Sequence, residues 1–211
     1  MNSQTQRQTV AGLAGNIECA IDNPAEPARG IAVVCHPHPQ HGGTLDNKVV
    51  QTLARAFVQR GFRSVRFNFR GVGASHGVWD EGRGEVDDAL AVIAASRGEG
   101  SDAVLPLMLA GFSFGAYVAT QAAVRLADDA KPQRLVLVGP STLAQQMPAV
   151  PPDTIVIHGE IDDVVPLAAT LAWARPQSLP VIVFPGVGHF FHGQLALLRN
   201  VVVQQLQRPT A

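Results

Sequence analysis

The chain has 211 residues, of which 46% are apolar, and its 16 basic and 17 acidic side chains give a formal net charge of −1. This length and composition predict one globular domain, residues 1–211, and exclude a disordered or fibrous chain. The balanced charge and the lack of a Lys/Arg run argue against binding to nucleic acid or to a membrane surface.

The N-terminal sequence MNSQTQRQTV is polar and lacks the apolar core of a signal peptide. No stretch of about 18 apolar residues could span a bilayer. The two cysteines, Cys19 and Cys35, do not form a disulfide framework. We therefore expect a cytoplasmic protein.

Strand-like and helix-like segments alternate along the chain. In chain order we expect one or two antiparallel edge strands within 9–21, a strand at 31–35, a helix at 45–60, a strand at 62–69, a helix at 85–96, a strand at 104–110, a helix at 114–127, strands at 134–139 and 154–158, a helix near 166–174, a strand at 181–184 and a helix near 191–207. This order predicts an α/β fold with a mostly parallel central sheet and helices on both faces.

The pattern G-x-S-x-G, which holds a nucleophilic serine at a strand-to-helix turn, occurs twice. One copy centres on Ser113; it directly follows an apolar run and leads into a helix rich in alanine. The other centres on Ser75; it begins several residues after its strand and continues into loop. The context favours Ser113 as the nucleophile and Ser75 as a turn residue, although Ser113 could also serve only as a helix N-cap.

A serine nucleophile needs a histidine base, and in this type of sheet the order along the chain is Ser, Asp/Glu, His. Three histidines follow the serine. His189 lies in a loop directly after the last predicted strand, where a base can reach a serine at the same sheet edge. His192 is the alternative base, and His158 comes too early in the chain.

The acid must lie between the serine and the base. The loop after the strand at 154–158 offers two adjacent carboxylates, Asp162 and Asp163, which position alone does not separate. Other aspartates lie at the end of a surface helix or at the opposite edge of the sheet: Asp128, Asp129 and Asp153.

Backbone N–H groups are expected to stabilise negative charge on the substrate oxygen. One donor is Phe114, which follows the nucleophile at the start of a helix. The second donor belongs to the loop at 36–44. Pro37 and Pro39 have no N–H, so His38 is the first available donor beyond the strand.

The same loop holds three histidines in six residues, which raises the question of a metal site. Its prolines stiffen the backbone, and Asp46 is the only nearby carboxylate. We therefore expect no metal, and the mechanism requires no cofactor.

Five segments together resemble the α/β-hydrolase superfamily, and more narrowly the small, lidless bacterial hydrolases related to dienelactone hydrolases and serine-peptidase-like esterases. They are HPHPQHGGTLDNKVV (36–50), RFNFRGVGASHG (66–77), GFSFGAY (111–117), IHGEIDDVVP (157–166) and GVGHFFHG (186–193). The resemblance implies Asp162 as the acid, at the fifth position of the H-G-x-x-D segment. It also places Arg70 in a glycine-rich loop, where we expect a structural ion pair.

Many members of this superfamily insert a helical lid where this chain has only the Pro-rich residues 140–153, so we expect an open, shallow site without a lid domain. Phe112, Phe190 and Trp79 are candidates for lining an acyl pocket. The favoured function is hydrolysis of small carboxylic esters, a carboxylesterase-like reaction on a small-molecule substrate, by a monomer or homodimer.

Three other interpretations remain open. Thioesters, lactones or small amides and peptides would use the same triad. The glycine-rich stretch 71–77 resembles a dinucleotide-binding loop of an oxidoreductase, but it does not open directly into a helix. The fold could also serve a non-catalytic binding protein.

Overall fold

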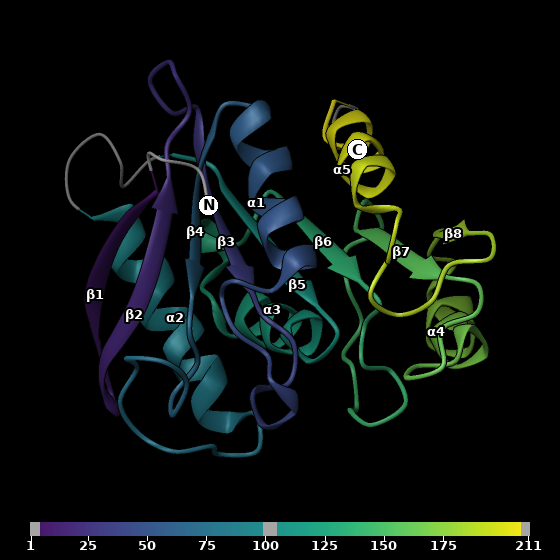
Figure 1. Cartoon of the computed structure of the whole chain (residues 1–211), viewed down its shortest axis with the longest axis horizontal. Coiled ribbons are helices and arrows are strands. Elements are labelled where there is room, and N and C mark those ends of the chain that lie inside the picture. The colour runs from purple at the N-terminus through teal and green to yellow at the C-terminus, as the bar shows by residue number, and fades with distance from the viewer. Residues whose placement is uncertain (1–4, 99–104, 208–211) are drawn as a thin grey trace.

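The computed structural model describes residues 5–98 and 105–207, and its frame is one eight-stranded sheet with the strand order β1-β2-β4-β3-β5-β6-β7-β8 (Figure 1). The strands are β1 Gln6–Gly12, β2 Gly15–Asp22, β3 Gly30–Cys35, β4 Phe62–Phe67, β5 Leu107–Phe112, β6 Arg134–Val138, β7 Ile155–Gly159 and β8 Val181–Phe184. The expected segments are all present, and residue 104, at the start of one predicted strand, lies outside the described ranges.

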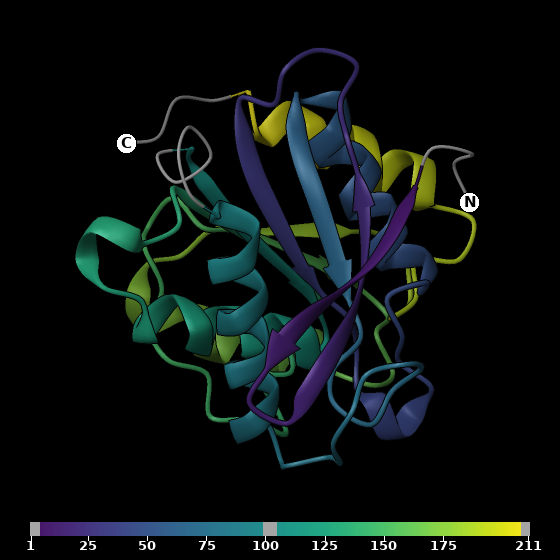
Figure 2. The ribbon, with the colours of Figure 1, turned by 90° about the vertical axis from the view of Figure 1, so that its left-hand side faces the viewer.

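Strands β3 to β8 are parallel, and the N-terminal hairpin of β1 and β2 adds an antiparallel edge. In the register between β2 and β4, Cys19 pairs with Phe67 and Asp22 with Ser64. The turn of the hairpin therefore lies at the same sheet edge as the carboxyl ends of the parallel strands. The prediction of edge strands within 9–21 is confirmed, and Figure 2 views the hairpin face-on.

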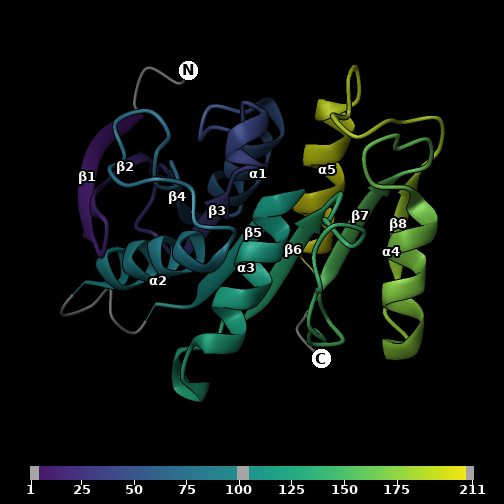
Figure 3. The ribbon, with the colours of Figure 1, turned by 90° about the horizontal axis from the view of Figure 1, so that it is seen from below.

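Helices cover both faces of the sheet, as Figure 3 shows. On one face lie α1 (Lys48–Gln59) and α5 (Leu195–Gln205), and on the other α2 (Arg83–Arg97), α3 (Phe114–Arg125) and α4 (Leu167–Ala174). Asn47 caps α1, since its side-chain oxygen accepts from the Val49 N–H at 2.9 Å. The α/β-hydrolase architecture predicted from the sequence is therefore the observed one.

Two apolar cores lie on opposite faces of the sheet. One joins the sheet to α2 and α3, and the other joins it to α1 and α5. Every residue of β3, β5, β6 and β7 is buried. This explains why these strands are near-continuous apolar runs, because a parallel strand covered on both faces has no solvent side.

Helix α3 approaches the sheet at backbone contact distance, and two glycines of the first G-x-S-x-G pattern make this possible. A Cβ on Gly115 would lie 2.3 Å from the carbonyl oxygen of Cys35, and a Cβ on Gly111 would lie 2.1 Å from the carbonyl oxygen of Gly115. No larger residue fits at either position without moving the helix. The motif thus fixes the distance between the end of β5, the end of β3 and the start of α3.

The helix boundaries differ from the predictions by up to four residues: α1 begins three residues later than predicted and α2 two residues earlier. Helix α3 ends at Arg125, and the two aspartates after it belong to a separate 3₁₀ turn, Asp128–Ala130. Helix α5 begins at Leu195, because Phe191 adopts a positive φ of 52° and residues 191–194 form turns. Within the described part of the chain, none of the helices has the length and apolar character needed to cross a bilayer.

Candidate active site

Ser113 occupies a strained turn between β5 and α3. Its backbone has φ 57° and ψ −118°, a region that L-residues rarely adopt, and its N–H donates to the carbonyl oxygen of Val138 at 2.9 Å. Its side chain makes no capping hydrogen bond to the helix, so helix capping does not account for the serine. Only 8% of the residue is exposed, which is the environment expected of a nucleophile held at a strand-to-helix elbow.

His189 and Asp162 form a buried pair at the carboxyl edge of the sheet. His189 Nδ1 lies 2.7 Å from Asp162 Oδ2, and the other carboxylate oxygen, Oδ1, accepts the N–H groups of Val164 (3.0 Å) and Val165 (2.7 Å). Burial raises the pKa of the Asp162 carboxyl, but the hydrogen bonds from His189 and Val165 outweigh it and hold that pKa below its ordinary value. Asp162 is therefore an ionised acceptor that can fix the ring orientation of His189.

The geometry separates the alternatives that the sequence leaves open. Asp163 is exposed, whereas the side chain of Asp162 is buried against His189. His192 is exposed and carries no contact to a carboxylate among the described residues. The arrangement pairs Asp162 with His189, as the resemblance implies.

The His189 ring lies beside the residues that hold Ser113. It packs on the Phe112 ring, the residue directly before the serine, with centroids 4.8 Å apart. A Cβ on Gly139 would lie 3.3 Å from Nδ1 and Cε1 of the same ring, and Gly139 follows the Val138 carbonyl that binds the serine backbone. The serine, the histidine and the aspartate thus come from three loops at one sheet edge.

The two expected oxyanion donors also lie at this edge. The Phe114 N–H is the first of helix α3 and has no partner within the helix. The His38 ring packs against Phe114, with centroids 5.1 Å apart, and against Trp79 at 4.6 Å. The contact brings the loop after β3 to the start of α3, and the N-terminal end of that helix favours negative charge.

The comparisons with known proteins agree with this geometry. Residues 26–170 match the model of a family described as serine aminopeptidase, S33. An α/β serine hydrolase of Xanthomonas campestris, described as lacking a lid, is 35% identical with a TM-score of 0.89, over 99% of this chain and 96% of that one. The chain is an α/β serine hydrolase.

Further relatives extend the comparison. An α/β serine hydrolase homologue of Coxiella burnetii is 39% identical with a TM-score of 0.85, over 95% of this chain and 97% of that one. A curated protein of Rickettsia prowazekii is 42% identical over 114 residues, which are 54% of this chain and 48% of that protein. The match thus spans about half the length of this curated relative.

The aromatic residues expected to line a pocket in this hydrolase divide into two groups. Phe112 is fully buried and belongs to the core between the sheet and α1 and α5, and its ring packs on that of His189 with centroids 4.8 Å apart. Phe190 is 46% exposed, and Trp79 is partly buried against His38. These two remain the pocket candidates.

The histidine-rich loop is held by internal hydrogen bonds. His36 is fully buried; its Nε2 accepts the Phe69 N–H at 3.1 Å, and its Nδ1 donates to the Pro37 carbonyl at 2.6 Å. Both ring nitrogens are therefore engaged. The residues that the structure describes contain no group of three or more His, Cys, Asp or Glu side chains placed for a metal ion.

The second G-x-S-x-G copy is structural in this hydrolase. The Ser75 hydroxyl donates to the Asn68 carbonyl at 2.7 Å and accepts the Glu18 N–H at 2.9 Å. The Ala74 N–H, which a phosphate would need, donates to the Glu18 carboxylate at 3.0 Å. A carboxylate of the protein thus occupies the place of an anion, and no helix opens before Arg83, which disfavours dinucleotide binding.

Arg70 is held by a buried ion pair, as expected. Its Nη2 lies 2.8 Å from Asp88 Oδ1, and both its Nε and its backbone N–H donate to Asp88 Oδ2. The pair joins the glycine-rich loop to helix α2. Arg70 is therefore a structural residue of the loop.

His158 is a site residue to which sequence reasoning assigned no role. It is fully buried, its Nε2 lies 2.8 Å from the Val165 carbonyl and 3.4 Å from Asp162 Oδ2, and burial lowers its pKa. A neutral ring that donates from Nε2 braces the turn that presents the Asp162 carboxylate. The signal in the sequence is a histidine at the end of an otherwise apolar strand.

Proposed function

We propose that this α/β serine hydrolase cleaves small carboxylic esters through an acyl-enzyme. The observation that carries the proposal is the buried hydrogen bond between His189 and Asp162 beside the strained turn of Ser113. A serine hydroxyl is a weak nucleophile unless a base takes its proton, and a carboxylate on the far nitrogen holds the base in the correct tautomer. The hydrogen bond between His189 and Asp162 is the second of these relations, and the packing of the His189 ring on Phe112 supports the first.

In the proposed reaction, Ser113 Oγ attacks the ester carbonyl while His189 Nε2 takes its proton. The N–H groups of Phe114 and His38 stabilise the oxyanion, a contribution worth about 3 kcal/mol for one donor in comparable sites. His189 then gives the proton to the departing alcohol. Water, deprotonated by the same ring, releases the acid and restores the serine.

The segment 140–153 supports an open site rather than one covered by a lid. Residues 140–153 contain no helix and lie against α4, where Trp173 Nε1 donates to the Pro148 carbonyl at 3.2 Å. The site therefore has no lid domain built from this segment. Because thioesters, lactones and small amides react through the same groups, bond type is a question for a substrate series.

The test is covalent labelling with a fluorophosphonate, followed by intact mass and peptide mapping. We expect one adduct on the wild type at Ser113 and none on Ser113→Ala. Ser96→Ala, which removes a hydroxyl from helix α2, serves as the control and should label fully. A folded wild type that stays unlabelled refutes the proposal, and an adduct that persists in Ser113→Ala moves the nucleophile to Ser75.

Turnover then separates bond types. Acetate, butyrate and longer esters of one chromogenic alcohol, and the matching thioester and anilide, give relative kcat/KM values. We expect short esters to be cleaved fastest. If an aminoacyl anilide is cleaved faster than every ester, the proposal of an esterase is wrong, and peptidase activity, as in the name of the matching family, takes its place.

A further inference from the structure

A groove of about 440 Å³ lies between helices α1 and α5, apart from the triad. These two helices pack against each other on one face of the sheet (Figure 1). From α1 it is lined by Lys48, Gln51, Thr52 and Arg55, and from α5 by Leu195, Ala196 and Arg199. The four residues of α1 are spaced by three, four and seven positions, so they form one stripe on the helix.

Three of the lining side chains are cations, and none is a carboxylate. Within residues 5–98 and 105–207, Lys48 and Arg199 have no ion pair, and Arg55 donates only to the Gln51 side chain, at 3.3 Å. The Nε of Arg199 is buried and has no hydrogen-bond partner in the same ranges. Three positive charges therefore converge on a concave site without a counter-charge from the described chain.

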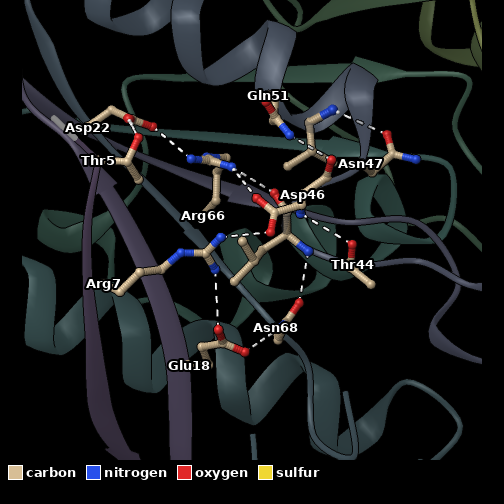
Figure 4. Close-up of polar contacts among 12 residues, drawn as sticks. Thr5, Arg7, Glu18, Asp22, Thr44, Asp46, Asn47, Gln51, Arg66 and Asn68 are labelled. Atoms are coloured by element: carbon tan, nitrogen blue, oxygen red, sulfur yellow. Dashed lines mark hydrogen bonds and ion pairs between the residues drawn. The ribbon is translucent and has the colours of Figure 1, made fainter. Parts of the chain in front are cut away.

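Two acidic residues near the groove, Asp22 and Asp46, are bound by other arginines (Figure 4). Asp22 Oδ2 accepts from Arg66 at 3.0 Å, and the carboxylate of Asp46 bridges Arg66 (3.3 Å) and Arg7 (2.7 Å). Asp22 and Arg66 line an adjoining cavity of about 330 Å³, which shares Gln51 and Arg55 with the groove. Both carboxylates are thus held in ion pairs with Arg66 and Arg7, and neither forms an ion pair with a cation of the groove.

We propose that the groove between α1 and α5 is a binding site for a small molecule that carries a diphosphate or two neighbouring phosphoryl groups. Each phosphoryl group brings about 1.5 to 2 negative charges at neutral pH, so two of them balance three cations within the volume of one small molecule. Carboxylates would need three separate groups to do the same. Guanidinium groups also bind phosphoryl oxygens in a bidentate manner.

The dimensions of the groove support this ligand class. Lys48 and Arg55 are seven residues apart on α1, which corresponds to about 10 Å along the helix axis. Arg199 faces this stripe from α5, and Gln51 and Thr52 supply neutral polar groups between the cations. The long side chains of Lys48 and Arg55 can bend from the two ends of this stripe toward its middle, where a diphosphate offers oxygens to both of them and to Arg199.

The experiment is calorimetric titration of the full chain with inorganic pyrophosphate in metal-free buffer at low ionic strength, since salt weakens such contacts. We expect binding of one pyrophosphate per chain. Arg55→Gln/Arg199→Gln should weaken the affinity by about tenfold or more, the equivalent of losing one strong charged contact. Lys48→Gln/Arg55→Gln changes only exposed residues and should weaken it similarly, which protects the test against misfolding around Arg199.

The matched control is Arg83→Gln/Arg175→Gln, which removes two exposed charges elsewhere on the surface. It should keep the wild-type affinity within about twofold, because α2 and the turn after α4, which carry these two arginines, lie on the face of the sheet opposite the groove. Titration with citrate, which carries comparable charge on carboxylates, tests the choice of phosphoryl groups.

The outcomes are decisive in either direction. One-to-one binding that both groove variants weaken and the control retains supports the proposal. Wild-type affinity in both groove variants, or no heat of binding with pyrophosphate, overturns it and leaves an acidic protein surface as the partner to seek. Citrate binding as tightly as pyrophosphate overturns the phosphoryl class. Fluorophosphonate labelling of Ser113 is measured separately, so this result does not depend on the proposed esterase activity.

Discussion

Acid should unfold this hydrolase in part through His36. The ring is fully buried, its Nε2 accepts the Phe69 N–H, and its centroid lies 4.4 Å from that of the Phe69 ring. Burial lowers the pKa of His36 to about 3, against an ordinary value near 6.5. The folded chain therefore keeps this ring neutral over a pH range in which the unfolded chain protonates it.

The sign and size of the effect follow from this difference. Between pH 6.5 and about 3 the unfolded state binds one more proton than the folded state, so stability falls as the pH falls. Each pH unit costs about 1.4 kcal/mol, and the whole interval costs roughly 5 kcal/mol. That is a large share of the 5–15 kcal/mol typical of a domain. Above pH 6.5 the contribution is constant.

The assay compares the wild type with His36→Asn by urea unfolding at pH 7, 6, 5 and 4, followed by tryptophan fluorescence. At pH 7 the variant should be less stable by about 1–3 kcal/mol, because the Phe69 N–H loses its acceptor. Its disadvantage should shrink by about 1.4 kcal/mol for each pH unit below 6.5 and vanish near pH 5. Ser96→Ala, which removes no titratable group, serves as the control and should show a pH-independent difference from the wild type. If the difference between the wild type and His36→Asn is the same at all four pH values, the argument from burial is refuted.

Three further predictions follow from the same structure. Asp162→Asn should lower kcat by about 10⁴-fold, because His189 would adopt the wrong tautomer. Asp163→Asn changes an exposed side chain and should keep kcat within about twofold of the wild type. Steady-state ester hydrolysis measures both. Asp88→Ala should destabilise the fold by about 3–5 kcal/mol in urea, because it leaves Arg70 unpaired in a largely buried place; a loss below about 1 kcal/mol would falsify this. Gly115→Ala should give little folded protein by circular dichroism, because its Cβ would lie 2.3 Å from a β3 carbonyl oxygen; a wild-type melting temperature would contradict the close approach.

The fold could be predicted from the sequence because the residue pattern of each segment matches the strand or helix that the segment forms. Strands buried on both faces are apolar runs, and the glycines of the first G-x-S-x-G copy fall between such a run and an alanine-rich segment. The same context separated Ser113 from Ser75, and the structure gives Ser75 two backbone hydrogen bonds. Chain order and loop position also led to His189, since parallel strands bring their carboxyl ends to one edge.

The sequence could not supply what depends on side-chain orientation. Asp162 and Asp163 are adjacent in the sequence, so position alone does not show which carboxylate faces His189. In the structure, the turn directs the N–H groups of Val164 and Val165 at Oδ1 of Asp162, which orients this side chain. Phe112 looks like a pocket residue from its place beside the serine, but the alternation of the strand turns its ring into the core. Chain order excludes His158 as the base because it precedes the acid along the chain, and it assigns the residue no other role. The contacts of His158 with the Val165 carbonyl and with Asp162 depend on the path of the loop, which the sequence does not give.

The contacts of the N-terminal hairpin reach the loop that carries the proposed oxyanion donor. Arg7 of β1 binds the carboxylate of Asp46, and Glu18 of β2 accepts from the Asn68 amide at 2.7 Å, while Asn68 accepts the Leu45 N–H at 2.8 Å (Figure 4). The hairpin precedes residues 26–170, which match the family model, so this bracing lies outside the matched region. His189 lies outside it at the other end. The matched residues include Ser113 and Asp162, whereas His189 and the hairpin contacts that brace the segment after the histidine-rich loop belong to segments beyond the two ends of that match.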